Sequence, residues 1–447
     1  MRTATISGVG LVFRAAALIV LIGVLSVAGC SGGAGDGSAS TTIKIGVDLP
    51  LTGDDGRAGV PALNGVRFFV HQHPTLDGFQ VVLDPKDDAV NGRHRPVLGA
   101  RNVQAFVDDP HVLGIVGPFD ANIARAEIPI ANRAGMAMVS PATGNPCLTK
   151  PVFLPAALNP ARSEISCQDA GVPAPTDLRP SARNNFFRLA ATDDLQGPAA
   201  ADFGYKDLNL RRVAVLSDHE VYGQALADGF ITRFTRLGGS VVLHLDLDPA
   251  ANPDVVAFLK AAKTDGAQGI YFGGVTANQG CAIRFQMKSV FDAGEKAPYL
   301  GGDGIAEDPA CVRDAGDNAI GIYATVAGVY ADQLASAQPA IAAFKAQYKD
   351  AADYGAYTIT AYDATGVLYD ALDRAIKAAG GKLPARDSVV AQLATTTAYR
   401  GATGTIGFDE AGDTTLRLIS VFEPAGADPN AGWTWVAAVD YSTTLPY

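Results

Sequence analysis

Three polar side chains, Asp193, Tyr222 and Asp303, each follow a separate apolar run that reads as a strand. They stand in the segments AATDDLQG, SDHEVYG and GGDGI. Ligands of doubly wound sheets bind outside the carboxyl ends of the strands, so we expect these side chains to converge on one site. Two carboxylates and a phenol suit an ammonium group, because a cation removed from water must be met by charge and hydrogen bonds. Taken singly, each Asp is more simply a helix cap, and only their convergence favours a site.

Two other loops have the character of an anion site. Pro118–Asn122 follows the run VLGIVG and opens a predicted helix, and Ser140–Pro146 follows MAMV and carries hydroxyls at Ser140 and Thr143. Helix N-termini present free backbone N–H groups to anions. The two loops together predict a carboxylate clamp, although ordinary strand-to-helix turns explain the same residues equally well.

The elements that must position these residues alternate between strands and helices from Ile43 onward. One series contains IKIGVDLP, FQVVLDP, VLGIVGPF and MAMVSPA, and a second contains RRVAVLSD, SVVLHLDL, GIYFGGV and APYLGG. Strands that alternate with helices predict a parallel sheet covered on both faces. We therefore predict an α/β fold of two doubly wound parallel-sheet lobes joined by a multi-strand hinge. The expected crossings lie near Leu189–Asp193, Tyr323–Ala327 and Ala398–Thr403.

The predicted organisation has six parts. They are a signal peptide (1–29), a flexible tether (30–42), lobe I (43–190, with an insert at 147–185), lobe II (191–325), a return to lobe I (326–400) and a return to lobe II (401–447).

The N-terminus indicates export. Arg2 and Arg14 precede an apolar block, Ala15–Ala28, which is too short to span a bilayer comfortably and fits a secretion signal. The residues Val-Ala-Gly-Cys that end at Cys30 resemble a bacterial lipobox, so Cys30 is expected to carry a lipid. The Gly- and Ser-rich stretch after Cys30 is expected to be a flexible tether. The predicted location is extracytoplasmic, with the lipid anchored at the cell membrane.

Four cysteines remain once Cys30 is set aside. In an oxidising compartment four thiols suggest two disulfides with three possible pairings, and we favour the local ones, Cys147–Cys167 and Cys281–Cys311. The Cys147–Cys167 disulfide would restrain the insert, which is rich in Pro and Ser and interrupts the alternation of strands and helices. No cysteine has the close spacing that a metal site needs.

Composition excludes several functions. A net charge of −11, with short and scattered basic runs, argues against nucleic acid as a partner. There is no G-x-S-x-G elbow and no phosphate-binding glycine loop, and no cofactor or metal is predicted. The pair Asp87-Asp88 lacks the spacing of a calcium loop and is expected to be a solvated strand end.

Several segments carry a family resemblance. IKIGVDLPLTGDDGRAGVPALNGVRFF, MVSPATGNPCLT, FFRLAATDDLQGPAAADF, VAVLSDHEVYGQALADGF, YLGGDGI and GTIGFDEAGD occur in this order. They resemble the substrate-binding proteins of branched-chain amino acid ABC transporters, which are type 1 periplasmic binding proteins. The resemblance runs from about Ile43 to near the C-terminus, interrupted by the insert. It implies a two-lobed protein without catalytic activity that closes on an amino acid and delivers it to permease and ATPase subunits.

The resemblance also implies roles for individual residues. The first lobe would hold the α-carboxylate of the ligand, through Ala121, Ala142, Thr143 and Gly144. The α-ammonium would be met by Asp303, with help from Asp193 and Tyr222.

Departures from the family pattern concern the same site. A common serine is replaced by Ala121, with Asp120 and Asn122 as polar neighbours, and a threonine is replaced by Gly144. Large aromatics that wall the side-chain pocket of leucine binders appear here as Ala58 and Val275. The pocket is therefore expected to be roomier than in the leucine binders.

Two rival functions share the same residues. One is a ligand sensor of this fold for amides, urea or small organic acids, which reports to a signalling partner. The other is a secreted hydrolase that uses the site residues for acid–base chemistry. A fold alone does not decide between them.

Overall fold

The computed structural model describes residues 42–53, 55–90, 93–161, 163–247, 254–291 and 297–446. The predicted signal peptide, Cys30 and the tether as far as residue 41 lie outside the described residues. In the described part of the chain, no helix combines the length and the apolar character that crossing a bilayer requires.

The first lobe is built on a sheet of six strands in the order β10-β7-β6-β1-β3-β2. All of its pairings are parallel except that of the short edge strand β2. The strands are β1 (Thr42–Leu49), β2 (Thr75–Leu76), β3 (Phe79–Asp87), β6 (Val112–Val116), β7 (Ala137–Ser140) and β10 (Phe186–Arg188). Every residue of β6 is buried, which explains why its sequence is apolar throughout.

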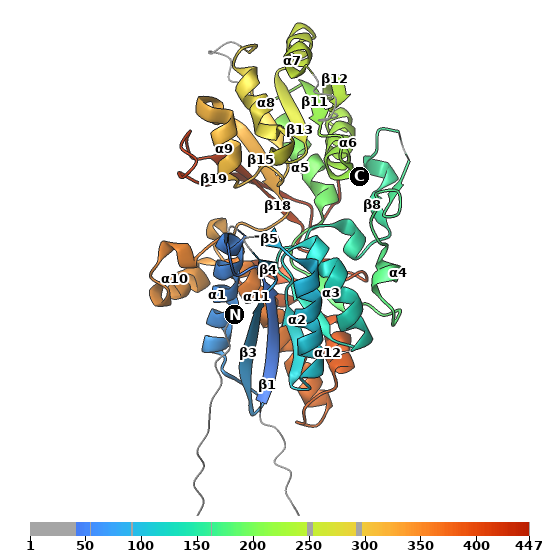
Figure 1. The fold of residues 1–447 in the computed structure, drawn as a ribbon, viewed down its shortest axis with the longest axis vertical. Coiled ribbons are helices and arrows are strands. Elements are labelled where there is room, and N and C mark those ends of the chain that lie inside the picture. The colour runs from blue at the N-terminus through green and yellow to red at the C-terminus, as the bar shows by residue number, and fades with distance from the viewer. Residues whose placement is uncertain are drawn as a thin grey trace, which may run out of the picture. The chain divides into compact units, whose positions relative to one another are not determined.

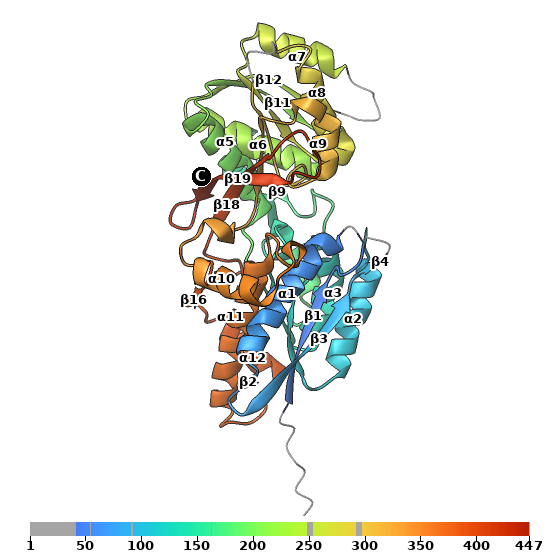
Figure 2. The same ribbon diagram turned by 90° about the vertical axis from the view of Figure 1, so that its left-hand side faces the viewer.

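Helices cover both faces of this sheet. One face carries α1 (Gly56–Gln72), α11 (Thr358–Ala378) and α12 (Arg386–Leu393), whose apolar side chains form one core with β1. The other carries α2 (Pro96–Asp108) and α3 (Ala121–Arg133), which form a second core with β6. Figures 1 and 2 both show α1 beside α11, across the sheet from α2.

The second lobe is built on a sheet of seven strands in the order β12-β11-β13-β14-β15-β18-β19. The strands are β11 (Arg212–Ser217), β12 (Ser240–Asp246), β13 (Gly269–Gly273), β14 (Tyr299–Gly301), β15 (Ile322–Val326), β18 (Leu418–Pro424) and β19 (Trp433–Asp440). The first five pair in parallel, as predicted. The last two are antiparallel, so the sheet is mixed at its C-terminal edge.

Among the described residues, five helices flank the second sheet. They are α5 (Gln196–Lys206), α6 (Val221–Arg236), α7 (Val255–Thr264), α8 (Gly280–Met287) and α9 (Pro309–Ala315). Side chains of α5 and α6 share one core, and those of α7, α8 and α9 share another on the opposite face. Two doubly wound lobes are therefore confirmed.

The third crossing between the lobes lies later in the chain than predicted. A hairpin of β16 (Tyr399–Gly401) and β17 (Gly404–Ile406) stays with the first lobe, because the Ala402 and Thr403 N–H groups donate to the buried carboxylate of Asp363 in α11, at 2.8 and 2.7 Å. Phe408 also packs in the first core. The expected crossing at Ala398–Thr403 is thus wrong, and the return to the second sheet begins at Leu418 and not at 401.

The insert is an ordered segment with a small core of its own. It contains β8 (Val152–Leu154), β9 (Ile165–Ser166), α4 (Pro175–Leu178) and the 3-10 turns η1 (Pro146–Leu148) and η2 (Ala156–Leu158). The disulfide Cys147–Cys167 lies at its centre, with 5.7 Å between Cα atoms. Leu148 and Leu178 pack in the first lobe, whereas Phe153 and Leu158 share a cluster with Ala225 of α6. The insert therefore contacts both lobes (Figure 1).

The second favoured disulfide is present as well. Cys281 of α8 is bonded to Cys311 of α9, with 5.0 Å between Cα atoms. Both sulfurs are buried in the core that these helices share.

Candidate functional site

The two predicted anion-binding loops of the first lobe are joined by one hydroxyl. Ser140 Oγ donates to Pro118 O at 2.7 Å and accepts from Thr143 N at 3.1 Å. Thr143 Oγ1 also donates to Ser140 Oγ, at 2.9 Å, and the Thr143 side chain is buried. The Thr143 hydroxyl therefore holds the loop in shape, and its predicted contact with a ligand stays a prediction.

Backbone N–H groups remain open at these loops. Asp120 caps α3 by accepting from Asn122 N and Ile123 N, at 2.7 and 3.3 Å, and Ala142 N donates to Ser140 Oγ at 3.3 Å. Within the described residues no group accepts from Ala121 N or Gly144 N. Two unpaired N–H groups beside a helix N-terminus suit an anion such as a carboxylate.

Arg188 holds the Ser140–Pro146 loop in place through hydrogen bonds to its backbone, a role that was not predicted from the sequence. Its buried guanidinium donates to Thr143 O at 3.2 Å and to Asn145 O at 2.7 Å, and Nε donates to Asp413 Oδ1 at 2.7 Å. Burial alone would raise the pKa of Asp413, but Arg188 and Lys150 hold it at about 2. A buried ion pair thus fixes the position of the Ser140–Pro146 loop.

The second lobe brings its predicted residues together. Tyr222 OH donates to Asp303 Oδ1 and accepts from Gly304 N at 3.2 Å. Gln196, a buried residue that the sequence analysis missed, accepts from Asp303 N at 3.0 Å and donates to Asp193 Oδ1 at 3.2 Å. One amide side chain therefore links the two aspartates.

Among the described residues no cation forms a hydrogen bond or ion pair with Asp193 or Asp303, and the charge of Arg188 offsets only part of the effect on Asp193. Burial raises the pKa of Asp193 well above its ordinary range, and the charge of Asp303 adds to that effect. Solvent reaches Asp303, yet the protein around its carboxylate removes part of its hydration, which raises its pKa as well. Burial and the same two carboxylates raise the pKa of Tyr222. A bound ammonium would relieve this repulsion.

Gly144 and Asp193 bring the two halves of the site into contact. Asp193 N donates to Gly144 O at 2.9 Å. Asp193 Oδ1 occupies the space where a side chain on residue 144 would begin. The Ser140–Pro146 loop and Asp193 are therefore neighbours, although a long insert separates them in sequence.

The other predicted residues have different surroundings. Asn122 is exposed, and its Oδ1 accepts from Arg125 at 3.0 Å. Val275 lies half-buried against the loop of Asp303, since a Cβ on Gly304 would be 2.9 Å from Val275 Cγ1. Ala58 lies half-buried in the first turn of α1, and no described hydrogen bond links it to the other site residues.

Two aromatic residues border the site without having been singled out in the sequence. Tyr357, at the start of α11, packs edge-on against Phe119 with ring centroids 4.7 Å apart. Burial raises the pKa of Tyr357, with added effects from Glu307, Asp303 and Asp193. Aromatic residues in loops are common in proteins, so the sequence carried no signal for these.

A second acidic group lies apart from the site, inside the first lobe. Asp48, Asp88 and Glu127 are fully buried, and Asn102 Nδ2 donates to Asp48 Oδ1 at 2.7 Å. Burial raises the pKa of Asp48 to about 7 and that of Glu127 well above its ordinary range. The expectation that the Asp87-Asp88 pair is a solvated strand end is wrong for Asp88. Among the described residues no group of three or more acidic, His or Cys side chains is arranged to hold a metal ion.

Comparison with known proteins agrees with this architecture. The profile of the periplasmic binding protein family matches residues 42–427. A Leu/Ile/Val-binding protein homolog from Brucella melitensis is 28% identical over 389 residues, which cover 86% of this chain and 92% of that protein. A solved leucine binding protein from Thermotoga maritima has a TM-score of 0.64 at 26% identity, and the match covers 90% of this chain and 99% of that one.

Proposed function

Because the chain belongs to the periplasmic binding protein family, in the group that serves branched-chain amino acid ABC transporters, we propose that it binds an amino acid between its lobes and delivers it to a membrane permease. One observation carries this proposal. The unpaired Gly144 N–H belongs to the loop that contacts Asp193, and Gln196 links the Asp193 carboxylate to Asp303. An α-amino acid carries the complementary pair of charges on one carbon atom.

In the proposed complex the α-carboxylate binds to the first lobe and the α-ammonium to the second. Charge-assisted hydrogen bonds to a carboxylate are stronger than neutral ones, so both ends of the ligand contribute affinity. Each end contacts a different lobe, and ligand binding therefore favours the closed arrangement of the lobes.

Calorimetric titration with a panel of amino acids and their analogues tests this function. An amino acid that binds should lose affinity when either its ammonium or its carboxylate is removed. A ligand whose deaminated analogue binds more tightly would contradict the proposal and favour a sensor or carrier of organic acids.

Delivery and anchoring form the second part of the proposal. The similarity of residues 27–30 to a lipobox supports a lipid on Cys30, which would keep the protein outside the cytoplasm at the cell membrane. Cys30→Ser protein should then lack lipid label and separate from membranes. Cells without this chain should lose uptake of the labelled amino acid, and unchanged uptake would contradict a role in import.

A further inference from the structure

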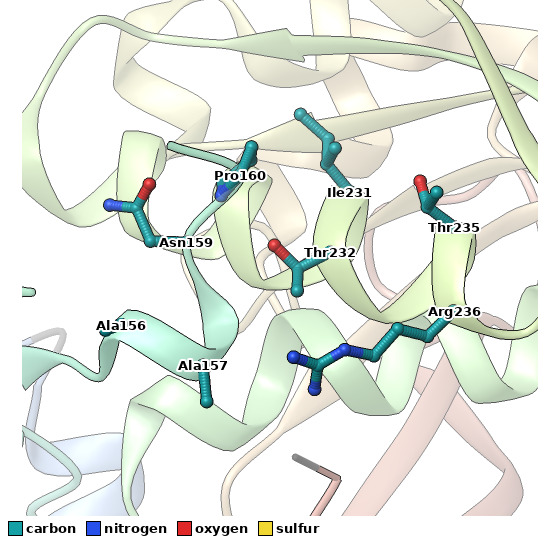
Figure 3. A pocket seen from close by; sticks show the side chains of 8 residues that line it. All are labelled: Ala156, Ala157, Asn159, Pro160, Ile231, Thr232, Thr235 and Arg236. Carbon is teal, nitrogen blue, oxygen red and sulfur yellow. The ribbon is translucent and has the colours of Figure 1, made fainter. Parts of the chain in front are cut away.

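A cavity of about 550 Å³ lies between the insert and the helix α6, away from Asp303 and its partners. Its lining residues are Ala156, Ala157, Asn159, Pro160, Ile231, Thr232, Thr235 and Arg236 (Figure 3). The volume is within the range of small-molecule sites, about 300–1,000 Å³. Neither wall shares a residue with the amino acid site.

Both walls of the cavity are well supported. The insert wall follows β8 and belongs to the segment stapled by Cys147–Cys167. The other wall is the last turn and a half of α6, a helix of 16 residues whose inner face packs in the second lobe. The backbone of both walls is therefore fixed before a ligand arrives, although the Arg236 side chain is exposed.

Two polar groups on α6 extend toward the insert in Figure 3. Thr232 Oγ1 is buried and has no hydrogen-bond partner, which is rare for a buried hydroxyl. The Arg236 guanidinium is the second group, and within the described ranges it has neither a carboxylate partner nor another acceptor. A third donor is available on the opposite wall, where Asn159 Oδ1 accepts from Ala161 N while its Nδ2 has no described acceptor.

The charge of the cavity favours an anion. Arg236 is the one charged residue among the lining residues that the structure describes. The C-terminal end of a helix ordinarily repels anions, but the last carbonyls of α6 accept from the N–H groups of Leu237, Gly238 and Gly239. These hydrogen bonds to the last carbonyls of α6 remove much of that repulsion. The Arg236 guanidinium is then the main charge at the cavity.

We propose that this cavity is a second binding site, for a small carboxylic acid with a compact apolar body. Arg236 would bind the carboxylate in the bidentate geometry that guanidinium groups favour. Thr232 Oγ1 would donate to one carboxylate oxygen and gain the partner that it lacks. The apolar body would lie against Ala157, Pro160 and Ile231.

Calorimetric titration with benzoate, and with benzamide as its neutral counterpart, tests the proposal on the exported chain. Benzoate should bind and benzamide should bind much more weakly. Arg236→Gln should weaken benzoate binding by about 10- to 100-fold, since it removes a charged hydrogen-bonding group. Thr232→Val keeps the shape of the side chain and should weaken binding by a smaller factor.

Arg313→Gln, at an exposed arginine of α9, is the matched control and should leave benzoate affinity unchanged. Thermal unfolding without ligand checks that each variant is folded. Failure of benzoate to bind wild type at millimolar concentration would overturn the proposal, as would equal binding to wild type, Arg236→Gln and Thr232→Val. Benzoate that binds only at the amino acid site would keep its affinity in both cavity variants and would be displaced by the amino acid ligand, which would also overturn the proposal.

Discussion

Gly144 leaves open the space that the Asp193 carboxylate occupies, since a Cβ built on Gly144 would lie 1.9 Å from Asp193 Oδ1. The family resemblance leads one to expect a threonine at this position, and a threonine would collide with Asp193. The departure at Gly144 is therefore coupled to the position of an acidic residue of the site.

Gly144→Ala should weaken binding of the amino acid ligand by about 10- to 100-fold. The new methyl group would displace the Asp193 carboxylate and break its hydrogen bond with Gln196, and a charged hydrogen bond contributes ~1.5–3 kcal/mol. Calorimetry measures the change. Gly426→Ala is the control, because the nearest atom to a Cβ there is at 3.9 Å. Unchanged affinity in folded Gly144→Ala protein would show that ligand binding does not depend on the position of the Asp193 carboxylate.

Asp303→Asn should lower affinity for the amino acid by about 30-fold to several thousand-fold. The substitution keeps the size of the side chain and removes its charge. In the proposed complex the lobes close over Asp303 and the ammonium, and leaving one member of a buried charge pair unpartnered costs ~2–5 kcal/mol. Titration of wild type and variant with the same amino acid measures this loss. An amino acid that binds both equally well would eliminate Asp303 as the partner of the ammonium.

Asp413→Asn should destabilise the protein by ~3–5 kcal/mol, because it leaves the buried Arg188 guanidinium without its counter-charge. Urea unfolding measures the loss. Asp387→Asn is the control, since the Arg183–Asp387 pair is exposed and such pairs contribute ~0–1 kcal/mol. Similar losses in the two variants would contradict the role given to Arg188.

The buried carboxyl of Asp48 should make the protein less stable as pH rises from 3.8, its ordinary pKa, to about 7. Below this window the carboxyl is protonated in both the folded and the unfolded chain. Within it the unfolded chain ionises first, so folding becomes less favourable, and above about pH 7 the loss is complete.

Asp48→Asn should flatten this profile and raise the melting temperature at pH 8, because the amide is neutral and still accepts from Asn102. Thermal unfolding at several pH values provides the measurement. Asp84→Asn, a half-buried strand residue paired with Lys86, should keep the wild-type slope. A wild-type slope in the Asp48 variant would rule out this carboxyl as its source.

The fold and the proximity of Tyr222 to Asp303 could be predicted from the sequence for one physical reason. Parallel strands end at a common edge, so Tyr222 and Asp303 had to lie near each other once their strands were recognised. The two disulfides were predictable too, because local pairings suited the spacing of four cysteines. Contacts such as Arg188 with Asp413 were not predictable, since 225 residues separate the partners and each reads as an ordinary charged residue.

Buried polar groups escaped prediction for a related reason. Asp88 and Gln196 are residue types usually found at surfaces, and only the three-dimensional packing shows that they are enclosed. The late crossing at Leu418 depends on hydrogen bonds from a hairpin to Asp363, which sequence periodicity does not reveal. The contact of the insert with α6 likewise required the structure.

The packing of α1 against α11 has a consequence for the order in which the chain folds. Thr358 Oγ1 donates to Pro61 O at 3.1 Å across 297 positions of sequence, and both helices contribute to the core that covers β1. A ribosome therefore synthesises the five parallel strands of the second sheet before it completes the first core. Contacts at such separation slow folding because the loop between them must close first. The first core is thus expected to form only after most of the second sheet has been synthesised, and truncation before Thr358 should leave the apolar face of α1 open to aggregation.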